Sequence, residues 1–594
     1  MADIVHGRDD LKASTPSQPK PGAAKPAAAF SASERATQPP RTDIGTLVLH
    51  WLTAIAFLVS LFTGIRIAAD ALHAPVSKWL SPILPQGEIW TFHFYAGLTL
   101  FFCTAAYFIY MRRSGLGSRN ALKKTRVMVM PVNTKMRFGG LNVLLHWAAY
   151  LIVGVMTITG IFLYLGHGGW LLQIHSYVAF IGLTYIFVHA LAHYLYGGWW
   201  QVFRVFRPAA LVLTSAVKPM PLLIAAGVGA VVIAGIAASD TIFRDQLTIR
   251  RVATAPDPKK LLDDPVWAGI APVRIHTQQG INLGGTGESL VEVRAVHDGK
   301  KVYFAFRWED PTRSVRREPL IKKEDGWHII ADNTYTDDVT TFYEDKFAVI
   351  FSTVNDFGSG GVSHLGPKPI AEYQGSRNAR GYHYTDGHMV DMWQWKASRG
   401  GLLGEVDDMY IGPPRPPTPS EVAKVNRYQA GYWGDPGDTP YTYNFKLYSP
   451  DEYKEGQAVE ILRLPKDYKE MNRKMGTWNP EPGGSVDDGS IWWMYPEETV
   501  PYSKEEDAKI PVGTIIPAVL ITGKHEGDRY DVKGAAHWAD GHWTLITSRD
   551  LKTGSKYDQD FVPGKDLYMW VSVFDHTQTR HTRHPRPVKI VTQE

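Results

Sequence analysis

The sequence contains a single cysteine, Cys103, among its 594 residues. One cysteine excludes an intrachain disulfide, the CxxCH attachment site of c-type haem, and iron–sulfur or zinc sites held by several cysteines. The chain also lacks Walker, Rossmann and Ser/His/Asp signatures, nucleic-acid-binding motifs and a paired-carboxylate motif. The residues that stand out are histidine and tryptophan, with 21 and 19 copies. The search for a functional site therefore begins with the histidines.

Hydropathy divides the chain into two unlike parts. Residues 44–239 are largely apolar, whereas residues 240–594 are polar, aromatic and rich in Gly and Pro. Residues 1–43 are rich in Pro, Ala and Ser, which predicts a disordered tail rather than a signal peptide. The apolar runs are long enough to cross a bilayer. We predict membrane spans at 44–69, 90–111, 141–165, 172–198 and 220–239.

Loop charge predicts the orientation. The loops 112–140 and 199–219 carry Lys and Arg but no acidic residue, which is typical of cytoplasmic loops. The amino terminus is then cytoplasmic, and five spans place the carboxyl-terminal part outside. The predicted localisation is the bacterial inner membrane, with several passes and a large periplasmic domain.

The fourth predicted span carries His175, His189 and His193. An ionisable ring inside lipid is costly, so it indicates a functional site. His175 and His189 are 14 residues apart. They therefore share a helix face and lie about 21 Å apart along the axis. This spacing suits ligands for two haems, one near each membrane surface.

The first and third spans share one pattern, and the openings of the second and fourth also match. The repeated positions are His50-Trp51 and His146-Trp147, each followed at the same spacing by Thr63-Gly64 or Thr159-Gly160. This repetition predicts a duplicated two-helix hairpin. The small Thr-Gly pairs are expected to allow close approach of a helix or a macrocycle.

Depth in the membrane pairs the histidines. The orientation puts His93 and His175 on the outer side, and His50 and His189 on the inner side. Two imidazoles on each iron give a low-spin centre suited to electron transfer rather than oxygen binding. The alternative is that these histidines only form hydrogen bonds between helices.

Residues 44–198 resemble the bacterial di-haem cytochrome b561 family, which includes the cytochrome b subunits of nickel–iron hydrogenase and formate dehydrogenase. The resemblance implies two b haems and a quinone site near the cytoplasmic haem. His146 departs from the simplest family pattern. It and His193 lie on the inner side, where they could line a quinone pocket, contact a haem propionate or form a structural interface.

The carboxyl-terminal part is predicted to be mainly β. Alternating residues and turns such as His297-Asp298-Gly299 favour an antiparallel sandwich. The stretch 353–440 shows no clear periodicity and is expected to be a long ordered loop region. The predicted fold class is a four-helix di-haem bundle with a fifth anchoring helix, followed by an exported β sandwich. The predicted segments are 1–43, 44–219, 220–257 and 258–594.

Residues 258–594 are similar to the ethylbenzene dehydrogenase-type haem-binding domain, the gamma subunit of certain molybdenum enzymes. The similar segments are VYFAFRWEDPT (302–312), DKFAVIF (345–351), MWQWKA (392–397), YDVKGAAHWADGHWTLITSRDL (530–551) and GKDLYMWVSVFD (564–575). That family implies a β sandwich that holds one b haem between a Met and a Lys.

The expected Met is not at its place, and the loop before MWQWKA offers His364 instead. We predict His364 as one ligand and Lys533 as the second. A ligating lysine must be deprotonated, which requires burial. The alternatives are a solvent-facing His364 and a surface Lys533. The competitors for the second position are His525, His383, His388 and Met389.

The predicted function is electron transfer between the quinone pool and a periplasmic cytochrome c or molybdenum-enzyme partner. It would use two intramembrane b haems and a third haem b in the exported domain. Whether this amounts to quinol oxidoreductase activity stays open. One alternative is an exported domain that binds carbohydrate or protein without haem. Another is a structural anchor that docks a separate catalytic subunit.

Overall fold

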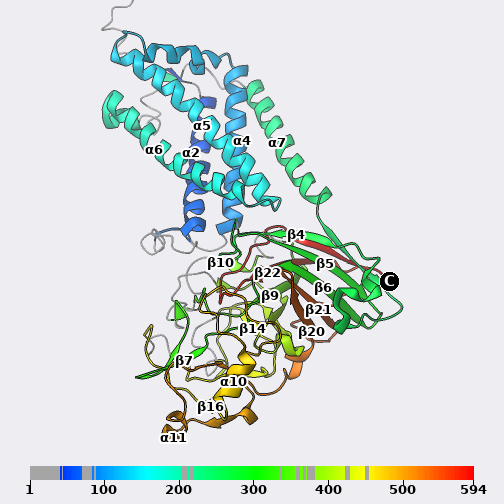
Figure 1. The fold of residues 1–594 in the computed structure, drawn as a ribbon. Coiled ribbons are helices and arrows are strands. Elements are labelled where there is room, and N and C mark those ends of the chain that lie inside the picture. The colour runs from blue at the N-terminus through cyan, green and yellow to red at the C-terminus, as the bar shows by residue number, and fades with distance from the viewer. Residues whose placement is uncertain are drawn as a thin grey trace, which may run out of the picture.

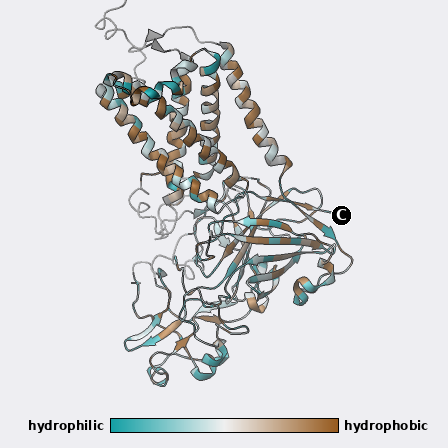
Figure 2. Ribbon diagram, turned by 45° about the horizontal axis from the view of Figure 1, so that its top comes forward, coloured by the Kyte–Doolittle hydropathy of each residue, from teal (hydrophilic) through white to brown (hydrophobic). Residues whose placement is uncertain are grey.

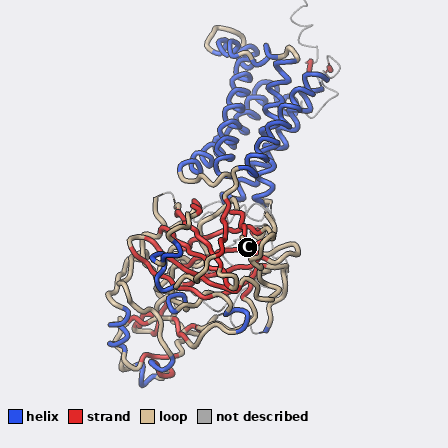
Figure 3. Tube along the Cα trace, turned by 90° about the vertical axis from the view of Figure 1, so that its right-hand side faces the viewer, coloured by secondary structure: helices blue, strands red, loops and turns tan. Residues whose placement is uncertain are grey.

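The computed structural model describes residues 41–42, 44–69, 83–85, 89–203, 212–213, 219–285, 287–334, 338–355, 361–364, 370, 382–419, 421, 429–448, 452 and 454–594. A helical part stands on a mainly β part (Figures 1 and 3). The predicted tail lies outside the described residues except for β1 (Arg41–Thr42), which pairs in parallel with β2 (Val212–Leu213).

The helical part confirms the first four predicted spans. Its long helices are α2 (Ile44–Ala69), α4 (Ile89–Arg113), α5 (Thr134–Tyr164) and α6 (Trp170–Val202). All four are long and apolar enough to cross a membrane. The helical part is largely hydrophobic (brown in Figure 2). Large apolar side chains on α6 are exposed, as expected for a surface in contact with lipid: Phe180, Phe187, Leu191 and Leu195.

Two helix boundaries differ from the sequence-based ones. The side chain of Asn133 accepts a hydrogen bond from the Met136 N–H at 2.9 Å, so this cap starts α5 before residue 141. The fifth helix, α7 (Pro219–Ile242), packs along α4. Its role as a membrane span stays a prediction.

The β part is built on one curled sheet. Its strand order is β14-β13-β12-β9-β22-β23-β3-β5-β6-β21-β20, with β4 paired to β5. The strands are β3 (Gln246–Arg251), β4 (Val273–Thr277), β5 (Ser289–His297), β6 (Lys301–Glu309), β9 (Lys346–Ser352), β12 (Val390–Lys396), β13 (Asp407–Ile411), β14 (Tyr432–Gly434), β20 (Lys533–Ala539), β21 (His542–Asp550), β22 (Leu567–Phe574) and β23 (Val588–Thr592).

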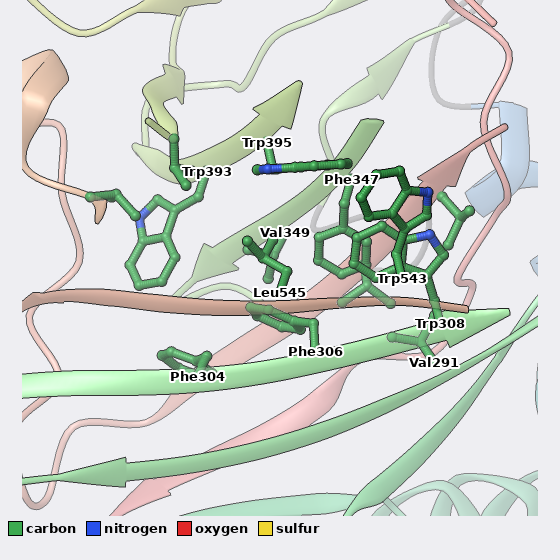
Figure 4. Close-up of a cluster of buried hydrophobic side chains, with 14 of the residues drawn as sticks. Val291, Phe304, Phe306, Trp308, Phe347, Val349, Trp393, Trp395, Trp543 and Leu545 are labelled. Atoms are coloured by element: carbon green, nitrogen blue, oxygen red, sulfur yellow. The ribbon is translucent and has the colours of Figure 1, made fainter. Parts of the chain in front are cut away.

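The layers of this sheet enclose an aromatic core. Trp308 stacks on Phe347 with ring centres 4.6 Å apart, and Trp395 lies 4.7 Å from Trp543 (Figure 4). The predicted sandwich is therefore confirmed as a mainly β domain. It differs in detail, because β3 pairs in parallel with both β23 and β5. These parallel pairs join the two layers into one sheet.

Smaller elements surround the main sheet. They are β7 (Leu320–Lys323), β8 (Gly326–Ile329), β10 (Ser363–His364), β11 (Tyr382–His383), β15 (Tyr441–Tyr443), β16 (Arg463–Pro465), β17 (Thr499–Pro501), β18 (Ile515–Ile516), β19 (Val519–Ile521), α10 (Tyr468–Met475) and α11 (Lys504–Asp507). The expectation of a loop across 353–440 was wrong for β12, β13 and β14. Both faces of β12 and β13 are buried, which removes the alternation that marks a half-exposed strand.

The two parts touch at the end of the bundle. The Arg583 guanidinium lies 4.4 Å from the ring centre of Trp90 at the start of α4. A Cβ atom at Gly168, in the turn between α5 and α6, would lie 2.6 Å from Gln278 Cδ. A larger residue here would have to displace the Gln278 side chain, so the glycine favours this close contact.

Candidate functional site

His93 on α4 and His175 on α6 face each other across the bundle. Their ring centres are 6.3 Å apart and their planes are 80° apart. Two imidazoles on opposite sides of one metal ion, each bonded at about 2 Å, have ring centres roughly 6 Å apart. The distance therefore fits two axial ligands of one iron.

A threonine holds each of these rings. Thr63 Oγ1 on α2 lies 2.9 Å from His93 Nδ1, and Thr159 Oγ1 on α5 lies 2.8 Å from His175 Nδ1. Each hydroxyl uses its only hydrogen in a bond to the carbonyl four residues earlier in its own helix, at 2.7 and 2.8 Å. Each oxygen must then accept a hydrogen bond from the Nδ1–H group. This leaves the lone pair on Nε2 of both histidines for a metal.

The glycines beside these threonines bring the helices close. A Cβ atom at Gly64 would lie 3.1 Å from His93 Cε1, and one at Gly160 would lie 3.4 Å from His175 Cε1. In each half of the bundle, the Thr-Gly pair seen in the sequence therefore contacts the repeated histidine. The pair orients the imidazole ring and also permits close packing of the helices.

A second histidine cluster lies deeper in the bundle. The ring centres of His189 and His193 are 4.7 Å apart, and the Tyr185 hydroxyl lies 3.3 Å from His189 Nδ1. His189 lies within electrostatic range of His50 and His146, and His50 lies within that range of His193. The structure therefore brings together the predicted inner pair and both of its predicted neighbours.

One cavity of about 2470 Å³ joins the outer histidine pair to the β part. It begins around His93 and His175, passes Gln278 and Arg583 at the junction, and reaches the face of the sheet near His364. Single-ligand sites usually measure about 300–1,000 Å³. This cavity has room for more than one large ligand.

His364 is buried, with 6% of its surface exposed, so the solvent-facing alternative is wrong. Its ring stacks on Tyr384, with centres 3.7 Å apart and planes within 10°. His383, a predicted competitor, also lines the cavity. Both residues belong to the short β10–β11 pair, which places them over the sheet.

The structure does not bring Lys533 to this cavity. Its half-buried ammonium group contacts the Tyr530 carbonyl and ring, and burial lowers its pKa to about 8. His525 is buried beside Asp407, 3.8 Å from the carboxylate, and burial lowers its pKa to about 4. His388 and Met389 are likewise not among the described residues that line the cavity.

Two buried lysines that the sequence reasoning missed line the cavity: Lys346 and Lys396. Each is buried at one end of a strand, β9 or β12, that is buried on both faces. The sequence did carry a signal for both residues, because each lysine lies next to a continuous apolar run. Lysine is rarely buried without a partner, so such a position is unusual.

Comparison with known families agrees with this division of the chain. Residues 264–586, over half of the chain, match the family described as ethylbenzene dehydrogenase. The chain belongs to the ethylbenzene dehydrogenase family. Residues 41–207 match the family described as prokaryotic cytochrome b561, so the protein fuses two family domains.

Comparisons with individual proteins add little to this assignment to the ethylbenzene dehydrogenase family. No curated protein matches the chain. One similar solved structure is a candidate carbohydrate-binding protein from Bacteroides uniformis ATCC 8492. It is 9% identical and covers 59% of this chain and 100% of its own, with a TM-score of 0.22. A likeness this weak carries no argument about function.

The cytochrome b561 match and the four membrane-length helices establish the general character of the protein. It is a multi-pass membrane b-type cytochrome that transfers electrons, with haem b in its membrane domain. The histidine geometry fits that cofactor, because Thr63 and Thr159 leave the Nε2 atoms of a correctly spaced pair available.

Proposed function

We propose that this cytochrome transfers electrons between the quinone pool and a periplasmic redox partner, through two haems in the membrane domain and a third in the β part. The observation that carries the proposal is the single cavity that links the His93–His175 pair to His364. A partner of either predicted class, a cytochrome c or a molybdenum-enzyme subunit, would exchange electrons at the β part.

His93 and His175 would hold the outer haem iron through Nε2. When bound, haem b supplies a reversible one-electron iron couple. Ligation by two imidazoles would favour electron transfer over substrate binding at the metal. Thr63 and Thr159 keep both rings in the required tautomer.

His50 and His189 would hold the inner haem. His146 and His193 lie in the same cluster and are proposed to border a quinone site. His146 Nδ1 lies 2.7 Å from the Asn142 carbonyl, which can only accept, so Nδ1 carries the proton and Nε2 presents its lone pair. A quinol hydroxyl in the proposed site could donate a hydrogen bond to that lone pair.

The proposed topology follows the loop charges. The amino terminus is cytoplasmic, 44–219 forms the di-haem domain, 220–257 is an anchoring helix and linker, and 258–594 is periplasmic. The basic loop 112–140 at the far end of the bundle from the β part supports this orientation.

His364 is the proposed ligand of the third haem in the β part. His383 lines the same cavity, but it pairs with Ser363 across β10–β11, so its side chain lies on the opposite face of this pair from His364. Lys533, the family-based candidate, would have to leave Tyr530 to reach the same space. The alternative of a binding module without haem predicts only two haems in the chain.

A pyridine haemochrome assay on the purified full chain tests the proposal. We expect three haems b per chain, and two after His364→Ala. His276→Ala, an exposed histidine on β4, is the matched control and should retain three. Two haems in the wild type would favour the binding-module alternative, and none would overturn the proposal.

A further inference from the structure

Lys346 and Lys396 lie directly opposite each other on the antiparallel strands β9 and β12. Both line the cavity, with only 3% and 6% of their surface exposed. Like charges at opposed positions destabilise a sheet, and a buried charge is costly unless it is paired. This pair therefore requires a compensating group.

The carboxylate nearest to Lys396 compensates the charge of this lysine only in part. The Lys396 ammonium contacts the Asp407 carboxylate directly. The same carboxylate accepts hydrogen bonds from Arg529, at 2.5 Å from Nε and 3.1 Å from Nη2. One carboxylate thus balances two cations.

Lys346 is less well compensated. Its ammonium donates a hydrogen bond to the Gln578 carbonyl at 2.6 Å and lies 4.2 Å from the Phe574 ring centre. Among the described residues, no carboxylate forms an ion pair with it. Burial, followed by the charges of nearby Arg399, Lys396 and Arg317, lowers the pKa of Lys346 well below its usual range, against an opposing effect of Glu344.

Glu344 is already engaged by other groups. It pairs with the Arg399 guanidinium and accepts hydrogen bonds from the Ser398 backbone and hydroxyl, at 2.7 and 2.8 Å. Glu318 likewise pairs with Arg317 at 2.6 Å. The protonated basic groups at this end of the cavity therefore outnumber the carboxylates beside them. An anion in the cavity would stabilise the charged form of the two lysines.

The sheet face beyond the lysines is largely apolar, although Gln394 also lies on it. Ala348 and Ile350 follow Lys346 on the same face of β9, and Met392 shares the face of Lys396 on β12. Val362, two residues before His364, packs on this apolar surface. The face therefore runs from a basic end to an apolar end that lies near the proposed iron ligand.

We propose that Lys346, Lys396 and Arg399 form a binding site for carboxylate or oxyanion groups. Because the sheet face continues from the basic groups as a largely apolar surface, the favoured occupant is a haem. Its propionates would lie at the basic end. That assignment rests on the third haem proposed above. A free oxyanion offers the same chemistry, and the experiment below separates the two sources.

The test compares haem b with its dimethyl ester, in which both propionates are neutral. The full chain, produced under haem limitation, is titrated with each compound, and binding is followed by absorbance. We expect a preference of about tenfold or more for the free acid in the wild type, since the ester cannot form charge-assisted hydrogen bonds with the basic groups. K346Q/K396Q should remove this preference at one of the binding sites.

Two matched variants guard against effects of misfolding. K346R/K396R keeps both charges and should retain the preference. K301Q, at an exposed lysine on β6 that pairs with Asp550 at 2.6 Å, should also retain it. Equal binding of both compounds by the wild-type β-part site, or an unchanged preference in K346Q/K396Q, would overturn the propionate assignment while leaving a count of three haems intact.

A count of two haems in the wild type would refute the third haem but not the anion site. Sulfate is then the probe, with tryptophan fluorescence of the full chain as the readout. Saturable sulfate binding that is lost in K346Q/K396Q and kept in K301Q would support a site for a free oxyanion. No binding of sulfate to the wild type would overturn the anion site as well.

Discussion

The hydroxyl oxygen of Thr159 lies 2.8 Å from His175 Nδ1, and Thr63 repeats this relationship with His93 at 2.9 Å. Each contact joins helices from the duplicated pattern, so the two halves of the bundle build one site. An axial imidazole that donates a hydrogen bond from Nδ1 is a stronger electron donor to its metal. The threonines are therefore positioned to influence the haem that His93 and His175 are proposed to hold, which is called the outer haem below.

Thr159→Val should raise the midpoint potential of the outer haem by tens of millivolts. Loss of the hydrogen bond weakens electron donation to ferric iron, and a neutral hydrogen bond is worth about 1 kcal/mol. Redox titration followed by absorbance measures the shift. Thr184→Val is the control, because the Thr184 hydroxyl is exposed and bonds within its own helix. An equal shift in both variants would argue against the effect.

His175→Ala should lower the haem content by one per chain, because it removes an axial ligand of the outer haem. His193→Ala should leave the count unchanged and slow the reduction of the haems by a quinol. The pyridine haemochrome assay and stopped-flow absorbance separate the two effects. If His193→Ala lost a haem and His189→Ala did not, the inner pairing would be reassigned.

Gly64→Ala should reduce the occupancy of the outer haem more than Gly160→Ala. The new methyl group would lie 3.1 Å from His93 Cε1 in the first variant and 3.4 Å from His175 Cε1 in the second. Gly154→Ala on α5 is the control, since a Cβ atom there meets nothing within 4 Å. A lower haem occupancy in Gly160→Ala than in Gly64→Ala would contradict this prediction. It would show that the helices can move apart to accommodate the methyl group at residue 64.

The stability of the β part should fall between pH 6.5 and 4, in part because of His584. Its Nδ1 accepts a hydrogen bond from the Val571 N–H at 3.2 Å, so the folded state needs a neutral ring. Burial lowers the pKa of His584 to about 3. The unfolded state therefore binds the proton first as pH falls, which costs about 1.4 kcal/mol per pH unit below 6.5.

Thermal unfolding of the full chain from pH 7 to 5 measures this loss. His584→Gln should be less stable than the wild type at pH 7, and the difference should shrink as pH falls. Buried carboxyls with raised pKa values, such as Asp345, act in the opposite direction but equally in both proteins. A constant difference across the range would exclude His584 as the titrating group.

Local periodicity in the sequence was sufficient to place the membrane helices and the His175–His189 spacing. Both depend on residues a few turns apart in one helix, where geometry is fixed by the backbone. The same reasoning identified the Thr-Gly repeat but not its hydrogen bonds to His93 and His175, because those bonds cross between helices.

The sequence alone determined that the chain has an apolar helical part with paired histidines and a mainly β part. Only the tertiary structure decided that Lys346 opposes Lys396, that His364 lines a cavity shared with the membrane histidines, and that Lys533 does not. These relationships join segments far apart in the chain. Strand pairing and sheet curvature determine these relationships. Neither property produces a local sequence pattern in strands that are buried on both faces.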